Sequence, residues 1–127
     1  MRTTIFVVDD DADAAETMAQ ALAGRGRNVR AFSDPIRALA AITAEGADLL
    51  IADLAMPWID GKDVLASARL RRPELAILLV SGMPNAAEVA AREGVPFFAK
   101  PVNFDRLRRC VDDTLCPIED GEPHALR

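Results

Sequence analysis

Side chains that can do chemistry stand directly after several short apolar runs of this sequence. Two aspartates follow the run at residues 5–8, a third follows the run at 49–52, and a serine and a lysine end two later runs. Carboxylate oxygens are the ligands that suit a hard cation such as Mg²⁺, whereas a lysine ammonium suits a phosphoryl group. The set comprises Asp9, Asp10, Asp53, Ser81 and Lys100.

These residue types, taken together, suit phosphoryl transfer. Three carboxylates in one place raise one another's proton affinity unless a cation compensates, so their combination predicts a Mg²⁺ site. A carboxylate is already ionised at neutral pH and can attack phosphorus without a general base. A lysine and a hydroxyl can stabilise the transferred oxygens. The residues therefore predict a site for Mg²⁺ and a phosphoryl group if the fold brings them together.

The elements expected around these residues would bring them to one place. Apolar runs of strand length alternate with segments of helical period, which predicts an α/β fold with an open parallel sheet and helices on both faces. Ligands of such sheets bind at the carboxyl ends of the strands, where this set would lie. The expected strands are 3–8, 29–32, 49–53, 75–82 and 95–101, and the expected helices are 14–23, one that starts at 33–35, 61–72, 86–94 and 103–115.

Other polar residues near these runs are given structural roles. Asp11 is expected to turn the chain, and Asp13 is expected to cap the first helix. The second strand ends in Phe32 and Ser33 and offers none of the required groups, so we place it at an edge of the sheet.

The composition indicates one folded domain. The chain has 127 residues, half of them hydrophobic, and a formal net charge of -5. That charge does not indicate a basic surface that would bind nucleic acid. No apolar run is long enough for a membrane span or a signal peptide, so we expect a cytoplasmic protein. Cys110 and Cys116 are expected to be reduced thiols in or after the last helix.

Four motifs, in this order along the chain, resemble the receiver domains of two-component response regulators. They are VVDDD at 7–11, IADLAMPWIDG at 51–61, LLVSG at 78–82 and FFAKP at 97–101. The resemblance covers about residues 3–115. It implies the flavodoxin-like strand order 2-1-3-4-5 and phosphorylation by a sensor histidine kinase or a histidine phosphotransfer protein.

The resemblance also assigns a role to each matched residue around the phosphoryl group. Asp53 would be the phosphoacceptor, and Ser81 and Lys100 would contact the phosphoryl group. Phe97 falls on the aromatic switch position, whose rotamer is coupled to the hydroxyl of Ser81. The Lys100–Pro101 peptide bond would be cis.

The resemblance to receiver domains also implies which residues would bind Mg²⁺. Asp10 and Asp53 would bind the ion directly, together with the backbone carbonyl of Ala55. Asp9 would act largely through a water molecule.

The sequence departs from the usual receiver pattern near the fourth helix. The stretch from Ser81 to Lys100 is a few residues shorter than is common, which predicts a short helix four. That helix belongs to a surface by which many receivers dimerise on phosphorylation. A dimer on phosphorylation is therefore possible here, but the resemblance alone does not predict that it uses this surface. Gly82 stands where alanine is common, and Phe97 lacks the hydroxyl that a tyrosine would offer.

The expected partners follow from the same resemblance. Helix one, with Met18 and Leu22, lies on the usual docking side for phosphohistidine donors, although most of its apolar residues are expected to belong to the core. The readout face would include strand five and helix five, with Arg106, Arg108 and Arg109, although a solvated face also accounts for these arginines. An acidic partner would suit that face, and the downstream protein is not identified.

The predicted domain organisation is a receiver at 1–116 followed by a mobile C-terminal tail at 117–127. No output domain is expected in this chain. A stand-alone receiver, a phosphate shuttle or sink, and a receiver excised from a longer protein all fit, and the initiating methionine favours the first.

Two other functions fit parts of the sequence. Asp9 and Asp11 could form the Asp-x-Asp arrangement of an aspartate-nucleophile phosphatase, but this leaves the motif at 51–61 unexplained. A receiver-like interaction module that never takes phosphate would have the same fold, but it has no reason to retain the acid, serine and lysine set. We therefore expect a receiver that catalyses only its own phosphorylation and dephosphorylation.

Overall fold

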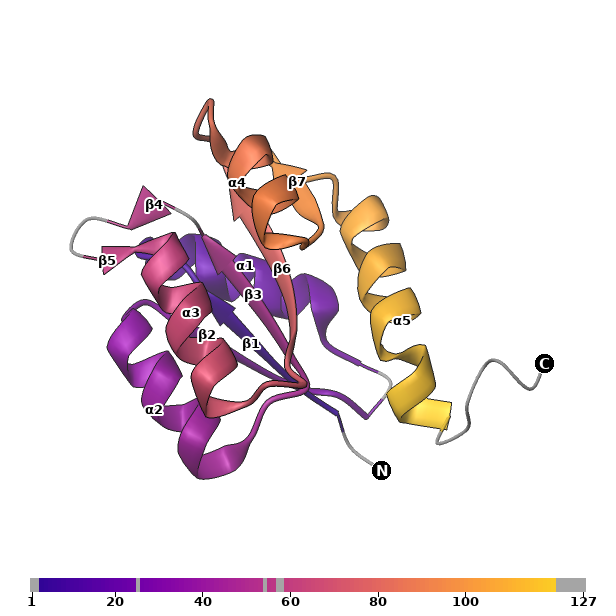
Figure 1. Ribbon diagram of the computed structural model, residues 1–127. Coiled ribbons are helices and arrows are strands. Elements are labelled where there is room, and N and C mark those ends of the chain that lie inside the picture. The colour runs from indigo at the N-terminus through magenta and orange to yellow at the C-terminus, as the bar shows by residue number, and fades with distance from the viewer. Residues whose placement is uncertain (1–2, 25, 54, 57–58, 121–127) are drawn as a thin grey trace.

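A five-stranded parallel sheet lies between two layers of helices in a computed structural model of the chain (Figure 1), which describes residues 3–24, 26–53, 55–56 and 59–120. The strand order is β2-β1-β3-β6-β7, which confirms the predicted order 2-1-3-4-5 and the edge position of the second strand. The strands are β1 (Thr4–Val8), β2 (Asn28–Phe32), β3 (Leu49–Asp53), β6 (Ala76–Ser81) and β7 (Phe97–Ala99).

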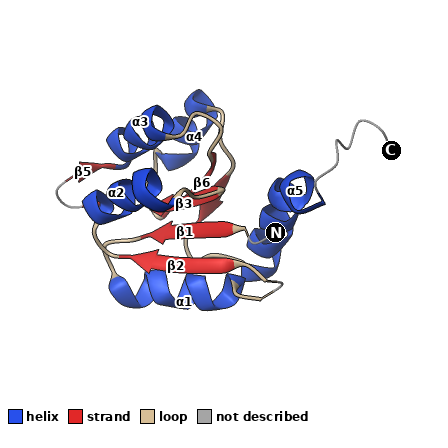
Figure 2. Ribbon diagram, turned by 90° about the horizontal axis from the view of Figure 1, so that it is seen from below, coloured by secondary structure: helices blue, strands red, loops and turns tan. Residues whose placement is uncertain are grey.

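Helices cover both faces of this sheet (Figure 2). The helices α2 (Pro35–Glu45), α3 (Gly61–Arg71) and α4 (Ala86–Glu93) cover one face, and α1 (Ala12–Leu22) and α5 (Phe104–Asp120) cover the other. Helix α4 has 8 residues, so the predicted short fourth helix is confirmed. No helix in the described part of the chain combines the length and apolarity needed to cross a membrane.

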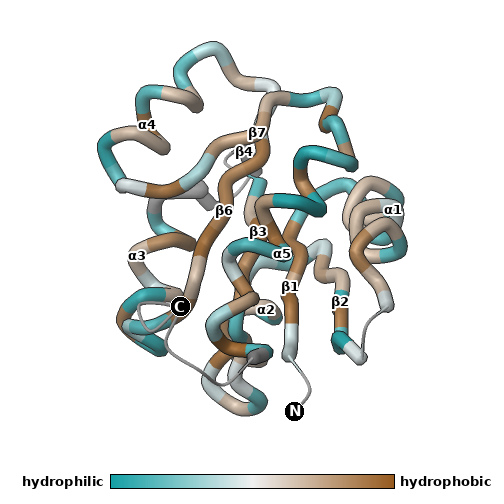
Figure 3. Tube along the Cα trace, turned by 90° about the vertical axis from the view of Figure 1, so that its right-hand side faces the viewer, coloured by the Kyte–Doolittle hydropathy of each residue, from teal (hydrophilic) through white to brown (hydrophobic). Residues whose placement is uncertain are grey.

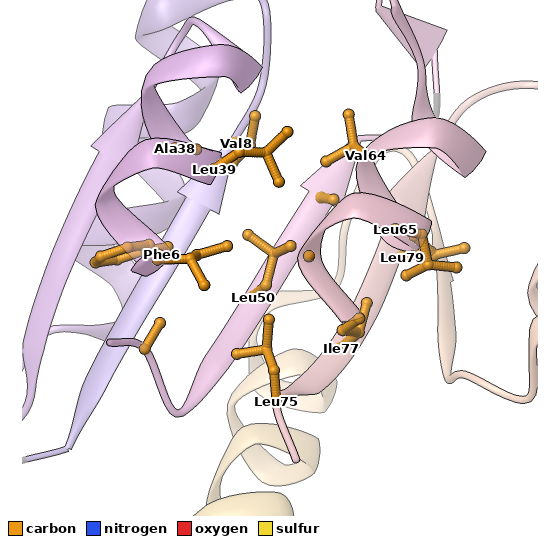
Figure 4. Packing of buried hydrophobic residues seen from close by; sticks show 14 of the residues in the cluster. Phe6, Val8, Ala38, Leu39, Leu50, Val64, Leu65, Leu75, Ile77 and Leu79 are labelled. Carbon is orange, nitrogen blue, oxygen red and sulfur yellow. The ribbon is translucent and has the colours of Figure 1, made fainter. Parts of the chain in front are cut away.

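The side chains of each strand alternate between two hydrophobic cores, because successive residues of a strand point to opposite faces. In β1, Phe6 and Val8 belong to the core beneath α2, α3 and α4, part of which Figure 4 shows, whereas Ile5 and Val7 belong to the core beneath α1 and α5. Hydrophobic residues therefore run almost unbroken along β1 and β6 (Figure 3). Burial of both faces fixes the register of the strands and hence the positions of their carboxyl ends.

The first helix begins earlier than the sequence predicted, and its cap is Asp11 in place of Asp13. The Asp11 carboxylate accepts hydrogen bonds from the backbone N–H groups of Asp13 and Ala14, at 3.0 and 3.3 Å. Helix α1 therefore starts at Ala12. The prediction was wrong by two residues because all four aspartates in the run 9–13 have the right chemistry for a cap.

The chain between β3 and α3 contains two short strands that the sequence analysis missed. β4 (Ala55–Met56) and β5 (Ile59–Asp60) pair in the antiparallel direction. Strands of two residues carry too little periodicity to be recognised. Gly61 begins α3 directly after β5.

Helix α5 continues to Asp120, beyond the boundary predicted at residue 116. Pro117 lies inside the helix, although proline lacks a backbone N–H and usually ends a helical pattern. Ile118 packs partly buried against the core under α1 and α5. Residues 117–120 are thus helical where a mobile tail was expected, and 121–127 lie outside the described residues.

A buried arginine ties this last part of α5 to the rest of the domain. The Arg27 side chain is only 5% exposed. Its Nε and Nη2 atoms each lie 2.9 Å from a carboxylate oxygen of Glu119, and its Nη1 atom lies 2.9 Å from Asp112. The hydroxyl of Thr3 also donates to Glu119, at 2.8 Å. The hydrogen bonds to Glu119, more than those to Asp112, raise the pKa of Arg27.

Replacement of Arg27 by methionine should therefore destabilise the domain. Arg27→Met removes the hydrogen bonds that Arg27 donates to Asp112 and Glu119, and the expected loss is about 2 kcal/mol in the free energy of unfolding. Urea denaturation measures this change, with Arg92→Met on the exposed side of α4 as the control. A loss no larger than that of the control would contradict the role of this cluster.

Candidate functional site

Three aspartates meet at the carboxyl edge of the sheet. Asp53 is the last residue of β3 and Asp9 follows β1, and these parallel strands pair directly, with Val8 beside Ala52. One carboxylate oxygen from each of Asp9, Asp10 and Asp53 lies within 4.8 Å of the others. Asp9 and Asp53 are only 4% and 7% exposed. The structure thus brings together the carboxylates that the sequence analysis had selected.

Lys100 lies between two of these carboxylates. Its Nζ atom is 2.8 Å from Oδ2 of Asp9 and 2.9 Å from Oδ2 of Asp53. Partial burial acts to lower the pKa of Lys100, but the hydrogen bonds and charges of Asp9 and Asp53 outweigh it and raise the pKa above its ordinary value. Lys100 is therefore a cation at neutral pH, and it offsets part of the negative charge at this edge.

Asp9 also shapes the turn that carries its neighbours. Its Oδ1 atom accepts a hydrogen bond from the backbone N–H of Asp11 at 3.0 Å, while Oδ2 receives Lys100. Both oxygens of this carboxylate are therefore engaged by the protein. This positioning role of Asp9 was not predicted from the sequence, because a hydrogen bond to a residue two places along depends on the local turn geometry.

Asp10 is the most exposed of the three aspartates, and its pKa is raised above the ordinary value. Its pKa is raised by partial burial, then by its hydrogen bond to and the charge of Asp9, and then by the charge of Asp53. A divalent cation would relieve this repulsion, since three carboxylates in contact favour a hard, oxygen-binding ion. The donor set therefore fits Mg²⁺.

A hydroxyl group lies at the end of the neighbouring strand. Ser81 ends β6, is almost completely buried, and accepts a hydrogen bond at Oγ from the backbone N–H of Met83 at 3.0 Å. The backbone N–H of Lys100 in turn donates to the carbonyl of Ser81 at 3.0 Å. The backbone around Ser81 and that around Lys100 are thus linked directly.

The remaining predicted residues lie around this edge. Phe97 in β7 is half-buried and packs against the core beneath α4. The Lys100–Pro101 peptide bond is cis. Ala55 is the first residue of β4, and the ligation of a metal by its carbonyl stays a prediction. Trp58 lies outside the described residues.

A hollow of about 420 Å³ opens beside the carboxylates. Asp9 and Lys100 border it on the side of the site, and Met18 on α1 and Phe104 on α5 provide an apolar wall. The carboxyl edge therefore has a neighbouring cavity into which a second molecule could place a side chain.

The fold and this edge define the receiver class of signalling domains. Residues 5–112 match the family described as the response regulator receiver domain. The chain belongs to this family. Receiver domains bind Mg²⁺ at an acidic pocket and are phosphorylated by histidine kinases, and in general they are not true enzymes.

Curated relatives with similar sequences are transcriptional regulators. The chain is 34% identical to the C4-dicarboxylate transport transcriptional regulatory protein DctD of Rhizobium meliloti over 82% of its own length and 23% of that protein. It is 29% identical to the DNA-binding transcriptional regulator NtrC of Salmonella typhimurium over 97% of its own length and 25% of that protein. The chain thus spans about a quarter of the length of these relatives.

Solved receiver structures superpose closely on this fold. The CheY-like receiver domain protein of Methanospirillum hungatei JF-1 aligns with a TM-score of 0.83 and 25% identity, over 96% of this chain and 100% of that one. NtrX of Brucella abortus, solved in complex with ADP, aligns with a TM-score of 0.81 and 32% identity, over 91% of this chain and 27% of that one.

The raised pKa of Asp10 predicts a pH-dependent effect on stability. Because the pKa of Asp10 is raised in the folded state, ionised Asp10 destabilises the metal-free fold, and Asp10→Asn should raise the free energy of unfolding near pH 7. The gain should be absent well below the ordinary pKa of 3.8 and should appear as the pH rises through the raised value. Urea denaturation at several pH values measures it.

Addition of Mg²⁺ should make the wild type more stable than Asp10→Asn, which reverses their order of stability without the ion. At roughly 100 times its dissociation constant, Mg²⁺ stabilises a protein by about 2.7 kcal/mol, and this gain should be largely lost in Asp10→Asn. Asp113→Asn on the exposed side of α5 is the control and should respond as the wild type does. Equal stabilisation of wild type and Asp10→Asn by Mg²⁺ would contradict a metal site at this edge.

Proposed function

We propose that this receiver takes a phosphoryl group from a phosphohistidine onto Asp53 and thereby switches a protein-interaction surface. One observation carries the proposal above all others. The Asp53 carboxylate ends β3 beside Asp9 and Asp10 and receives a hydrogen bond from Lys100 at 2.9 Å. An acceptor carboxylate, two further acidic groups and a cation are thus gathered within one cluster.

The transfer needs little beyond this arrangement. A carboxylate oxygen of Asp53 attacks the phosphorus of the donor, a P–O bond forms, the P–N bond of the phosphohistidine breaks, and the electron pair leaves with the histidine nitrogen. Asp53 gives up no proton, because it reacts as a carboxylate. Lys100, already in contact with Asp53, can then donate to an oxygen of the transferred group.

Mg²⁺, when bound, would neutralise the oxygens of the phosphoryl group and hold them against the acceptor. Asp10 and Asp53, with the carbonyl of Ala55, are its proposed direct ligands, and Asp9 acts largely through a water molecule. The engagement of both Asp9 oxygens by Lys100 and by the N–H of Asp11 supports this indirect role.

The proposed switch joins Ser81 to Phe97. The added phosphoryl oxygens offer new acceptors to the Ser81 hydroxyl. A rotation of that hydroxyl would disturb the hydrogen bond from Met83 and the loop that follows β6. Phe97, packed against the core beneath α4, is the side chain that this rearrangement would reach next.

Two surfaces are proposed for partners. The hollow beside Met18 and Lys100 would admit the phosphohistidine of a sensor histidine kinase or a histidine phosphotransfer protein. A second hollow of about 610 Å³ lies between β7 and α5 and is lined by aromatic residues and by Arg106 and Arg109. Its lining contains no acidic residue, so an acidic downstream protein would suit it.

The contacts of Asp11 weigh against a phosphatase that uses Asp9 as its nucleophile. Asp11, the second aspartate of that alternative, uses its carboxylate to cap α1.

The acceptor can be identified by labelling. Incubation with Mg²⁺ and labelled acetyl phosphate should label the wild type at Asp53, and Asp53→Ala should retain no label above background. Beryllofluoride with Mg²⁺ should change the fluorescence of Trp58, the only tryptophan, in the wild type and not in Asp53→Ala. Label that stays after the substitution, or that appears on Asp9, would show that the acceptor is misassigned.

Loss of Lys100 should separate phosphorylation from the response. Lys100→Met keeps the acceptor carboxylate but removes the cation that contacts both Asp9 and Asp53. Labelled phosphate should still be incorporated on Asp53, at least tenfold more slowly if one charge-assisted contact is lost. The Trp58 fluorescence response should disappear. An unchanged response in Lys100→Met, with Arg92→Met as the control, would rule out this role.

A further inference from the structure

Helix α2 keeps one side exposed at an edge of the domain. It packs against α3 and over β1 and β2, and β2 is the edge strand of the sheet. Nothing in the described part of the chain covers the outer side of this helix. The exposed residues on that side are Ile36, Arg37, Ala40, Thr43, Ala44 and Glu45.

The middle of this exposed side is apolar. Ile36 is 64% exposed, although burial of a side chain of that size would be favourable. Ala40 and Ala44 follow it at intervals of four residues, so the three lie next to one another along the helix surface. Alanines on this line would let a second helix approach to about 8 Å, the short end of the range for packed helices. The outer side of α2 therefore suits another helix.

A hollow of about 630 Å³ borders the same helix on the side of β2. Alanines of α2 line it on one side, and Phe32 and Arg30 of β2 line it on the other. The guanidinium of Arg30 lies 5.0 Å from the centre of the Phe32 ring and forms an ion pair with Glu45. The hollow thus leaves space beside Glu45 for a long side chain from an approaching helix.

The charges at the two ends of α2 are self-complementary. The Arg37 side chain is 83% exposed and makes only a loose ion pair with Asp34, at 3.9 Å. Glu45 ends the helix, and its side chain is 45% exposed. Arg37 and Glu45 are separated by about 12 Å along the helix axis. When two copies of α2 cross antiparallel near the middle of the helix, each Arg37 therefore faces Glu45 of the other copy.

We propose that the outer side of α2 is an interface between two copies of this chain, which pack their α2 helices antiparallel about a two-fold axis. Arg37 of each copy forms an ion pair with Glu45 of the other copy, and Ile36 of each packs against Ala44 of the other. The interface lies at the edge of the sheet opposite β7, and it contains none of the residues around Asp53. It therefore forms with or without a phosphoryl group, and the inference is independent of the proposed function.

Sedimentation equilibrium measures this dimer. One helix from each copy makes a small interface, so the expected dissociation constant is about 0.1 mM. Beryllofluoride with Mg²⁺ should leave this constant unchanged, because the interface is separate from the site. A wild type that stays monomeric up to about 1 mM, or that dimerises only with beryllofluoride, would overturn the proposal.

Charge reversal identifies the surface. Arg37→Glu and Glu45→Arg should each weaken the dimer at least tenfold, because like charges then meet at both ends of the helix pair. An equimolar mixture of the two variants should associate again, since every pair across the interface is then of opposite charge. Ala40→Gln should weaken association without any change of charge, because the longer side chain prevents the close approach of the helices. Circular dichroism and urea denaturation check that each variant is folded.

The matched control makes the same charge change on another helix. Arg92→Glu, on the exposed side of α4, should dimerise as the wild type does. Equal weakening in Arg92→Glu, or a mixture that associates no better than either variant alone, would show that α2 is not the interface. If the wild type takes up no labelled phosphate, the proposed function fails while the association results stand.

Discussion

The balance of charge at the carboxyl edge of the sheet is the constraint on which the site depends. Parallel strands that all end at one edge bring Asp9 and Asp53 together at the ends of buried strands, where repulsion between carboxylates is poorly screened. Lys100 offsets part of this charge through two ion pairs. The pKa of Asp10 is raised by partial burial and by the neighbouring carboxylates, and a divalent cation can offset the negative charge of these groups.

Much of the sheet and most of the site were predictable from local sequence. Several apolar runs of strand length end in a single polar residue. Because the strands are parallel, the residues at their carboxyl ends lie close together in space. Asp53, Ser81 and Lys100 were found in this way, because each ends or follows an apolar run of strand length. The resemblance to receivers predicts roles that spacing alone could not, such as the proposed distinction between Asp9 and Asp10.

The features that escaped prediction depend on contacts between distant residues or on fine local geometry. Any of several aspartates could have capped α1, and only the turn held by Asp9 selects Asp11. The continuation of α5 past Pro117 is supported by Arg27 and Ile118, which no helical pattern reveals. The hydrogen bond from Arg69 on α3 to the carbonyl of Glu93 is likewise not predictable from the sequence, because it joins two different helices.

The cluster around Arg27 has a mechanical consequence. The carboxyl end of α5 is joined by Glu119 both to Arg27, just before β2, and to Thr3, just before β1. A pull applied to the chain at this end would therefore be borne by two strands of the sheet as well as by the hydrogen bonds of the helix. The force would reach the sheet at the amino ends of β1 and β2. The aspartates lie at the opposite, carboxyl edge, so a pull on α5 would act on the sheet at the edge away from the site.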